Sequence, residues 1–342
     1  MKKILIGAGV AVAVALTGCQ AETPVDSFSA CMVGGASGFE DRAFNQVSHE
    51  GLLKAKENFG IEVKTASSKA EADYAKDIQS MVDAKCDIII TVGSQFGETT
   101  EAAAKKSPDI QFAIVDTAYD APPANLRSLL FKTEEPSFMA GYAAASLSKS
   151  GTVATFGGRQ VPAVTAFMSG FVQGVEYYNE QHGASIKAIG WDGSAGEFVQ
   201  SDRPFADPEA AKAVAQGLAD QGADIILAAA GGSGQGALDL AKESNGALSI
   251  IWVDTDGAVS QEGFAPVIPT SVVKAADVAV YEAIKSAKAG DFSNEAYVGT
   301  LANQGTYLAP FHDFDAQVSD ATRTELDRLK YDIQMGNITI NL

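Results

Sequence analysis

The sequence is poor in the residues on which many enzymes and metal sites depend. It has three histidines and three cysteines in 342 residues. Neither internal cysteine has a histidine near it in a recognisable pattern, so a Cys–His nucleophile is not indicated. The chain also lacks the HExxH and CxxC metal motifs, the GxSxG serine elbow and a phosphate-binding P-loop. We therefore predict no metal, no cofactor and no catalytic residue, and a protein that binds without turnover.

Basic residues are also scarce. The chain has 25 Lys and Arg against 43 Asp and Glu, which gives a formal net charge of −18. Nucleic-acid binding needs a positive surface, and no basic stripe is present, so nucleic acid is excluded as a partner. The apolar content of 46% is sufficient for two packed domains at this length.

No hydrophobic run in the sequence is long enough to span a bilayer. The apolar run from Ile4 to Leu16 follows a basic start and leads into Thr17-Gly18-Cys19, the pattern of a bacterial lipoprotein signal peptide. A plain secretory signal with an incidental cysteine is the alternative. We expect residues 1–18 to be the signal peptide, Cys19 to carry lipid such as palmitate, and residues 19–27 to form a tether. The body would then be anchored to the cell membrane, facing the periplasm or the extracellular side.

One stretch of the chain occurs twice. Residues 87–117 and 224–255 each open with Asp and an apolar β-branched run, turn through Gly and Ser, and close with a strand ending in Val-Asp-Thr. Such apolar runs are typical of strands buried on both faces of a parallel sheet. A strand that runs into a double glycine precedes each copy. We therefore predict an α/β fold with two doubly wound parallel-sheet lobes and a central ligand cleft between them.

The lobes are expected to divide the chain near residue 133. Residues 28–133, with later crossover segments, form the N-terminal lobe, and residues 134–342 form the C-terminal lobe, with terminal segments crossing between the two. A further strand is expected over residues 267–272, with Lys274 just after it. We expect a monomer.

Several polar and aromatic residues follow the predicted strands, where ligands of such sheets bind. Asp116 and Asp254 end the two Val-Asp-Thr segments and should face a common cleft, although each could instead cap the next helix. Phe44 and Asn45 lie in the first turn of a helix that Asp41 can cap. A stacking ring beside an amide suits a flat heteroaromatic base, whereas a core Phe and a solvated Asn are the simpler alternative.

Two cysteines remain beyond the signal peptide. Cys31 and Cys86 both lie in or next to predicted strands. A disulfide is possible in an exported protein, and two small buried thiols fit the pattern at least as well.

Short motifs along nearly all of the mature chain resemble those of the basic membrane protein family, the purine nucleoside receptor-type lipoproteins of ABC importers. The matching segments, in order, are Asp41-Arg42-Ala43-Phe44-Asn45-Gln46, Glu135-Pro136-Ser137-Phe138-Met139-Ala140-Gly141, Gly157-Gly158, Phe167 to Gly174, Trp252-Val253-Asp254-Thr255-Asp256 and Thr270-Ser271-Val272-Val273-Lys274. Gly257 and Pro136 depart from the family pattern, where Gln and Gly are usual.

The resemblance implies a type I periplasmic-binding-protein-like fold, with a hinge between the two lobes. It also implies an extracytoplasmic binding lipoprotein that captures a nucleoside, most simply a purine nucleoside, and delivers it to ABC permease and ATPase subunits. Phe44 would stack on the base and Asn45 would bind its edge. The ligand-binding residues that the resemblance implies are Asp41, Phe44, Asn45, Asp116, Phe205, Gly232, Asp254 or Asp256, and Lys274. Alternatives are a sugar, an amino acid or a signalling molecule in the same fold, a ligand-sensing receptor, or a nucleoside hydrolase that uses Asp116 or Asp254.

Overall fold

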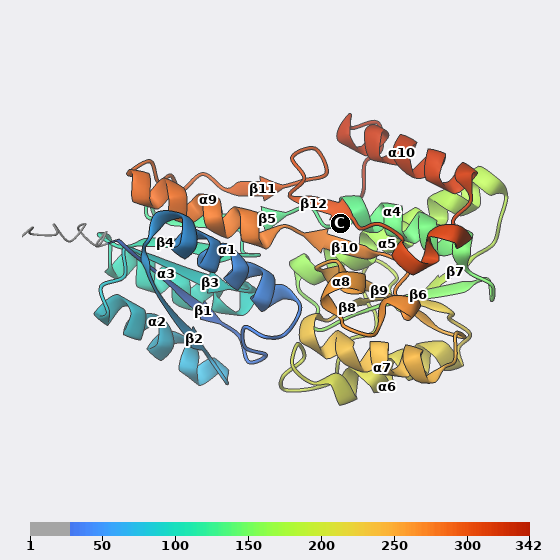
Figure 1. The fold of residues 1–342 in the computed structure, drawn as a ribbon, viewed down its shortest axis with the longest axis horizontal. Helices are drawn as coiled ribbons and strands as arrows, with labels where there is room; N and C mark the ends of the chain where they lie inside the picture. Colours follow the sequence, from blue (N-terminus) through green and yellow to red (C-terminus); the bar gives the residue numbers. More distant parts are fainter. Residues whose placement is uncertain (1–27) are drawn as a thin grey trace, which may run out of the picture.

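Residues 28–342 are described by a computed structural model. They form two α/β lobes side by side, as Figure 1 shows. The predicted signal peptide and the whole of the predicted tether, Cys19 included, lie outside the described residues. Among residues 28–342, no helix combines the length and the apolar character needed to cross a membrane.

Lobe one is built on a sheet with the strand order β11-β5-β4-β3-β1-β2, in which all neighbours are parallel. Its strands are β1 (Ser29–Gly34), β2 (Glu62–Ser67), β3 (Ile88–Val92), β4 (Gln111–Val115), β5 (Leu126–Phe131) and β11 (Tyr297–Gly299). Its helices are α1 (Phe44–Phe59), α2 (Tyr74–Asp83), α3 (Gly97–Lys106) and α9 (Ala276–Ala289).

Two helix layers enclose this sheet. Helices α1 and α9 pack with one set of strand residues, and α2 and α3 with the alternate set. Ile88 and Ile90 of β3 therefore face one layer and Ile89 faces the other. Since side chains alternate along a strand, burial on both faces requires apolar residues at every position, which explains the unbroken apolar run.

Lobe two repeats this plan with the order β12-β10-β9-β8-β6-β7. Its strands are β6 (Thr152–Gly157), β7 (Lys187–Ile189), β8 (Ile225–Ala229), β9 (Ser249–Asp254), β10 (Ser271–Lys274) and β12 (Thr306–Leu308). Its helices are α4 (Glu134–Leu147), α5 (Pro162–His182), α6 (Pro208–Asp220), α7 (Gln235–Glu243), the short α8 (Gly257–Ser260) and α10 (Asp320–Gln334). The matching strand orders confirm the predicted fold class.

The two sheets differ at one edge. The last strand of lobe two, β12, runs antiparallel to β10, whereas its counterpart β11 runs parallel to β5. The chain passes between lobes after β5, after β10 and between β11 and β12, because α4 packs in lobe two and α9 in lobe one. These three crossings form the connection about which the lobes can move.

The strand expected over residues 267–272 is wrong in position. Ala265–Val267 forms a 3₁₀ turn, and β10 begins only at Ser271 and ends at Lys274. Pro266 lies within the 3₁₀ turn, and it has no backbone N–H to donate to a neighbouring strand. Lys274 is consequently the last residue of the strand.

Cys31 and Cys86 are joined by a disulfide, with a Cα–Cα distance of 6.0 Å. Cys31 lies in β1, and Cys86 comes just before β3, the strand that pairs with β1. Both sulfurs are buried in the core beneath α2 and α3. Of the two possibilities that the sequence leaves open, the structure therefore has the bonded pair.

Candidate functional site

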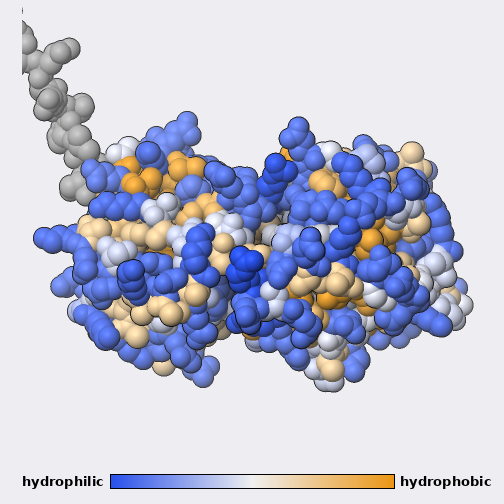
Figure 2. Space-filling model, turned by 90° about the horizontal axis from the view of Figure 1, so that it is seen from below, coloured by the Kyte–Doolittle hydropathy of each residue, from blue (hydrophilic) through white to orange (hydrophobic). Residues whose placement is uncertain are grey.

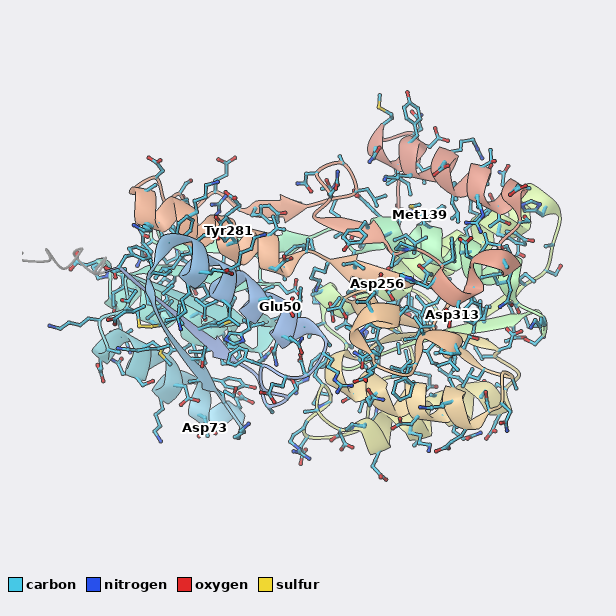
Figure 3. All side chains as sticks on the ribbon, viewed as in Figure 1. Glu50, Asp73, Met139, Asp256, Tyr281 and Asp313 are labelled. Carbon is cyan, nitrogen blue, oxygen red and sulfur yellow. A yellow bond between two sulfur atoms is a disulfide. The ribbon has the colours of Figure 1, made fainter. Side chains whose placement is uncertain are left out.

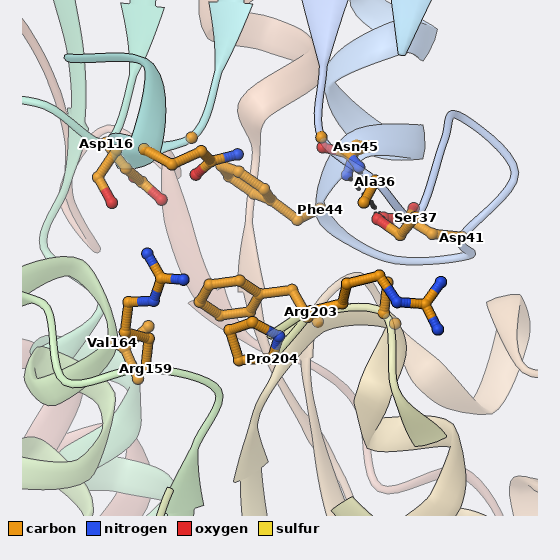
Figure 4. Close-up of a pocket in the computed structure, with 18 of the residues that line it drawn as sticks. Ala36, Ser37, Asp41, Phe44, Asn45, Asp116, Arg159, Val164, Arg203 and Pro204 are labelled. Atoms are coloured by element: carbon orange, nitrogen blue, oxygen red, sulfur yellow. Dashed lines mark hydrogen bonds between the residues drawn. The ribbon is translucent and has the colours of Figure 1, made fainter. Parts of the chain in front are cut away.

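A cavity of about 260 Å³ lies between the lobes, at the carboxyl ends of the central strands of both sheets. Lobe one contributes the loop before α1 and the ends of β3 and β4, and lobe two contributes the segments after β6 and β8 and the ends of β9 and β10. Figure 4 shows side chains from both lobes entering this space. This is the position predicted for a ligand of two parallel sheets.

Asp116 and Asp254 both line the cavity, at equivalent positions after β4 and at the end of β9. Both residues have positive φ, 68° and 71°, a conformation that non-glycine residues adopt uncommonly. Neither carboxylate caps a helix among the described residues. The matched backbone turn thus directs the two side chains into the cavity, as predicted.

Lys274 joins the two carboxylates. Its Nζ lies 2.7 Å from Asp116 Oδ2 and 3.6 Å from Asp254 Oδ1. The lysine side chain is 3% exposed, so it is not the solvated lysine that is the common case. Its ammonium also lies over the Phe44 ring at 4.7 Å from the centroid. Burial lowers the pKa of Lys274, but the Asp116 and Asp254 charges outweigh burial, and the net shift is upward.

Asp254 is the most perturbed carboxylate of this cluster. Burial raises its pKa, Lys274 lowers it and the negative charge of Asp116 raises it again, to about 6. The group is therefore ionised at neutral pH but close to titration. An ionised carboxylate accepts hydrogen bonds only, which suits a ligand hydroxyl.

The loop before α1 is held by Asp41. Its carboxylate accepts hydrogen bonds from the backbone N–H groups of Ala43, Asn45 and Gln46 and from Ser37 Oγ. Asp41 therefore caps the start of α1 as predicted, and burial raises the pKa of its carboxyl group.

Phe44 and Asn45 begin α1 and line the cavity. Asn45 is 4% exposed and donates from Nδ2 to Ser37 Oγ at 2.7 Å, so the alternative of a solvated amide is wrong. Phe44 is only partly buried, with part of its ring packed on the lobe-one core. An aromatic face and a fixed amide thus lie together on lobe one.

Phe205 lines the cavity from lobe two. Its ring rests on Gly158, where an added Cβ would lie 2.3 Å from Phe205 Cε1. At Gly232 an added Cβ would lie 3.6 Å from the Cβ atoms of Ser37 and Asp41 in lobe one. Gly158 therefore allows the ring to seat, whereas an added Cβ at Gly232 would make only ordinary van der Waals contact with lobe one.

Asp256 does not line the cavity, and this corrects its inclusion among the binding residues. Its Oδ2 lies 2.7 Å from His312 Nε2, and its side chain is labelled in Figure 3 on lobe two. The reason is its position in the turn into α8, two residues beyond the end of β9. Of the pair left open by the sequence, Asp254 is the residue in the cavity.

Sequence reasoning did not assign several polar residues that line the cavity, among them Lys69, Glu71, Tyr74, Gln95, Arg159, Asp202 and Arg203. Gln95 follows the Gly93-Ser94 turn, Arg159 follows the double glycine after β6, Tyr74 begins α2, and Arg203 lies two residues before Phe205. For Gln95 and Arg159 the sequence already indicated a position after a strand end. No local pattern marks Arg203. In residues 28–342 no group of three or more His, Cys, Asp or Glu side chains is arranged to hold a metal ion.

Comparison with known proteins agrees with this geometry. The family model of PnrA-like ABC transporter substrate-binding proteins matches residues 28–305. The chain belongs to this family. Basic membrane protein A of Borreliella burgdorferi is 36% identical over 222 residues, which are 64% of this chain and 61% of that protein. The CD4+ T-cell-stimulating antigen of Listeria monocytogenes is 32% identical over 281 residues, 78% of this chain and 75% of the relative.

Several solved structures share the fold of this chain. A solute-binding protein of an ABC transporter system from Aeropyrum pernix K1 superposes with a TM-score of 0.81 at 23% identity, over 91% of this chain and 92% of the other. The arabinose-binding protein AraP of Geobacillus stearothermophilus gives a TM-score of 0.61 at 16% identity, over 85% and 99%. At these identities the likeness establishes the two-lobed binding-protein fold.

Proposed function

We propose that this chain is the solute receptor of an ABC importer and that it binds a nucleoside between its lobes. One observation carries the proposal. A single cavity is lined by an aromatic ring from each lobe, Phe44 and Phe205, together with the buried cluster of Asp116, Asp254 and Lys274. Flat rings suit a base, and the charged cluster suits a sugar with several hydroxyls.

Each half of the ligand has its own set of contacts in this proposal. The base stacks between Phe44 and Phe205, with a gain of about 1–3 kcal/mol per stack, and Asn45 binds its edge. Asp254 and Asp116 accept hydrogen bonds from the ribose hydroxyls, Lys274 donates to them, and the backbone at Gly232 contacts the sugar. Asp41 acts through the loop that it caps, because its carboxylate already accepts four hydrogen bonds.

Anchoring and delivery complete the proposed function. Lipid on Cys19 would hold the body at the outer side of the cell membrane, and the closed lobes would present the ligand to a permease driven by ATPase subunits. We propose that the protein acts as a monomer.

Native mass spectrometry and calorimetric titration test the ligand. We expect adenosine, guanosine or inosine to bind, and ribose or amino acids to bind much more weakly. Phe44→Ala and Asp254→Ala should each weaken binding at least about tenfold, as expected for loss of a base stack or a charged hydrogen bond. Phe314→Ala, which removes a partly buried ring of lobe two outside the cavity, is the matched control.

Two results would contradict the proposal. Tight binding of a ligand without an aromatic ring, unaffected by Phe44→Ala, would retain the fold and reject the nucleoside. Recovery of free base after long incubation with a nucleoside would show a hydrolase; we expect the nucleoside to be recovered intact by chromatography.

A further inference from the structure

Arg159 is a charged cavity residue that a neutral nucleoside leaves without a counterpart. It follows Gly158 at the end of β6 and lines the cavity from lobe two. No carboxylate of the described residues lies within ion-pair distance of this exposed side chain, and its charge opposes the rise in the pKa of Tyr74 that burial causes. Since arginine stays charged at any physiological pH, this is a permanent positive charge facing the ligand space.

The position of Arg159 within the cavity points to one end of the ligand. In Figure 4 its guanidinium projects from lobe two at the same end as Asp116, whereas Asn45 and Asp41 lie at the opposite end. Asp116 belongs to the cluster assigned to the ribose, and Asn45 to the edge of the base. Arg159 is therefore placed to meet a substituent on the sugar.

The charges of Lys274, Asp116 and Asp254 explain why an anionic substituent on the sugar would need a further cation. Lys274 is shared between Asp116 and Asp254, and both partners are nearly buried with it. An anion at this end would be repelled by the carboxylates unless another positive group faced it. Strongly hydrophilic side chains gather at the waist between the lobes in Figure 2. The other cations that line the cavity are Lys69, Arg159 and Arg203, and the carboxylates of Glu71 and Asp202 line it as well.

We propose that the ligand carries a phosphate on its ribose and that Arg159 binds this phosphate. The inference deepens the proposed function, on which it rests, by naming a nucleoside monophosphate as the preferred substrate class. A guanidinium matches the geometry of a phosphate with two parallel N–H···O hydrogen bonds. Arg159 is exposed in this arrangement of the lobes, and its hydrogen bonds to an anionic phosphate would be stronger than those to a neutral hydroxyl.

Calorimetric titration of the purified protein with adenosine and with adenosine 5′-monophosphate tests the inference. We expect the monophosphate to bind more tightly than the nucleoside. Arg159→Gln should weaken monophosphate binding at least about tenfold, as expected for hydrogen bonds between charged groups, and leave adenosine binding unchanged within error. Arg159→Lys should give an intermediate loss, because it keeps the charge but not the two-pronged geometry.

Arg323→Gln is the matched control, since it makes the same change on α10, outside the cavity. It should alter neither affinity. Binding of adenosine without binding of the monophosphate, or an equal loss of both in Arg159→Gln, would overturn this inference and leave the nucleoside proposal standing. Failure of both ligands to bind would overturn the proposed function itself, and this inference with it.

Discussion

At the scale of single residues, the buried cluster of Lys274, Asp116 and Asp254 dominates the electrostatics of the site. Three charges lie in a space where each side chain is at most 10% exposed. Charges taken from water are tolerated only when they are paired, and here one ammonium pairs with two carboxylates. The cluster is therefore both a candidate binding surface and a structural requirement.

Removal of the ammonium should destabilise the fold. Lys274→Met leaves two buried carboxylates without a cation, and we expect the free energy of unfolding to fall by about 3–5 kcal/mol in denaturant titrations. Lys212→Met, which breaks the exposed pair with Glu243, should cost at most about 1 kcal/mol. Equal losses in the two variants would show that Lys274 is not stabilising the carboxylates.

The pKa of Asp254 predicts a pH dependence of binding. Because burial raises this pKa to about 6, protonation removes an acceptor for a ligand hydroxyl as the pH falls through that value. Between about pH 7 and pH 5 the ionised fraction, and with it the affinity for adenosine, should fall about tenfold. Asp254→Asn should bind weakly with no such dependence; a wild-type affinity that is constant over this range would contradict the assignment.

The raised pKa of Asp254 affects the stability of the fold in the opposite direction to ligand binding. The folded-state pKa lies above the value of 3.8 for the unfolded chain, so the native state binds the proton more tightly. The stability contributed by Asp254 is fully present below that unfolded value and is lost as the pH rises through about 6. Neutral pH thus favours ligand binding at some cost to the ligand-free fold.

At the scale of elements, the close packing of α4 on α5 depends on glycine. A Cβ added at Gly174 of α5 would lie 2.0 Å from the carbonyl oxygen of Phe138 on α4, and one at Gly141 would lie 2.0 Å from that of Phe171. Backbone atoms cannot move aside as a flexible side chain can. The sequence pattern of small residues in both helices is explained by this contact.

Gly174→Ala should therefore force α4 and α5 apart. We expect a loss of about 1–3 kcal/mol in the free energy of unfolding, typical of overpacking. Gly217→Ala, on the exposed face of α6 with no atom within 4 Å of the added Cβ, is the control. It should gain about 0.5–1 kcal/mol, because alanine is the better helix former. A gain in both variants would mean that the helices can separate freely.

At the scale of the whole molecule, the two lobes touch through contacts that do not involve a ligand. The backbone carbonyl of Arg42, in lobe one, accepts hydrogen bonds from Gln261 Nε2 at 2.7 Å and from Thr255 Oγ1 at 3.3 Å, both in lobe two. Gln261 is 1% exposed, so this contact is shielded from water. Such contacts stabilise the closed arrangement of the lobes.

Gln261→Ala should shift the ligand-free protein toward an open form. Small-angle X-ray scattering should report a larger radius of gyration, and adenosine affinity should fall by about two- to tenfold, the worth of one net hydrogen bond. Gln216→Ala on exposed α6, whose amide bonds to Asp220 within one helix, should change neither quantity. An unchanged radius and affinity in Gln261→Ala would show that closure does not depend on this contact.

The sequence by itself determined the architecture, because the features that specify it are local and repeated. Unbroken apolar runs predict strands covered on both faces, and two copies of one strand–helix–strand unit predict two sheets of matching order. The carboxyl ends of parallel strands converge, so Asp116, Asp254 and Phe44 could be assigned to one cleft in advance.

Only the tertiary structure decided which neighbours those residues have. The bond between Cys31 and Cys86, the choice of Asp254 over Asp256, the burial of Lys274 between two carboxylates and the free guanidinium of Arg159 all depend on contacts between distant segments or between lobes. A sequence pattern reports the face on which a side chain lies. The partner of that side chain depends on how the elements pack and how the lobes close. Local periodicity determines neither the packing nor the closure.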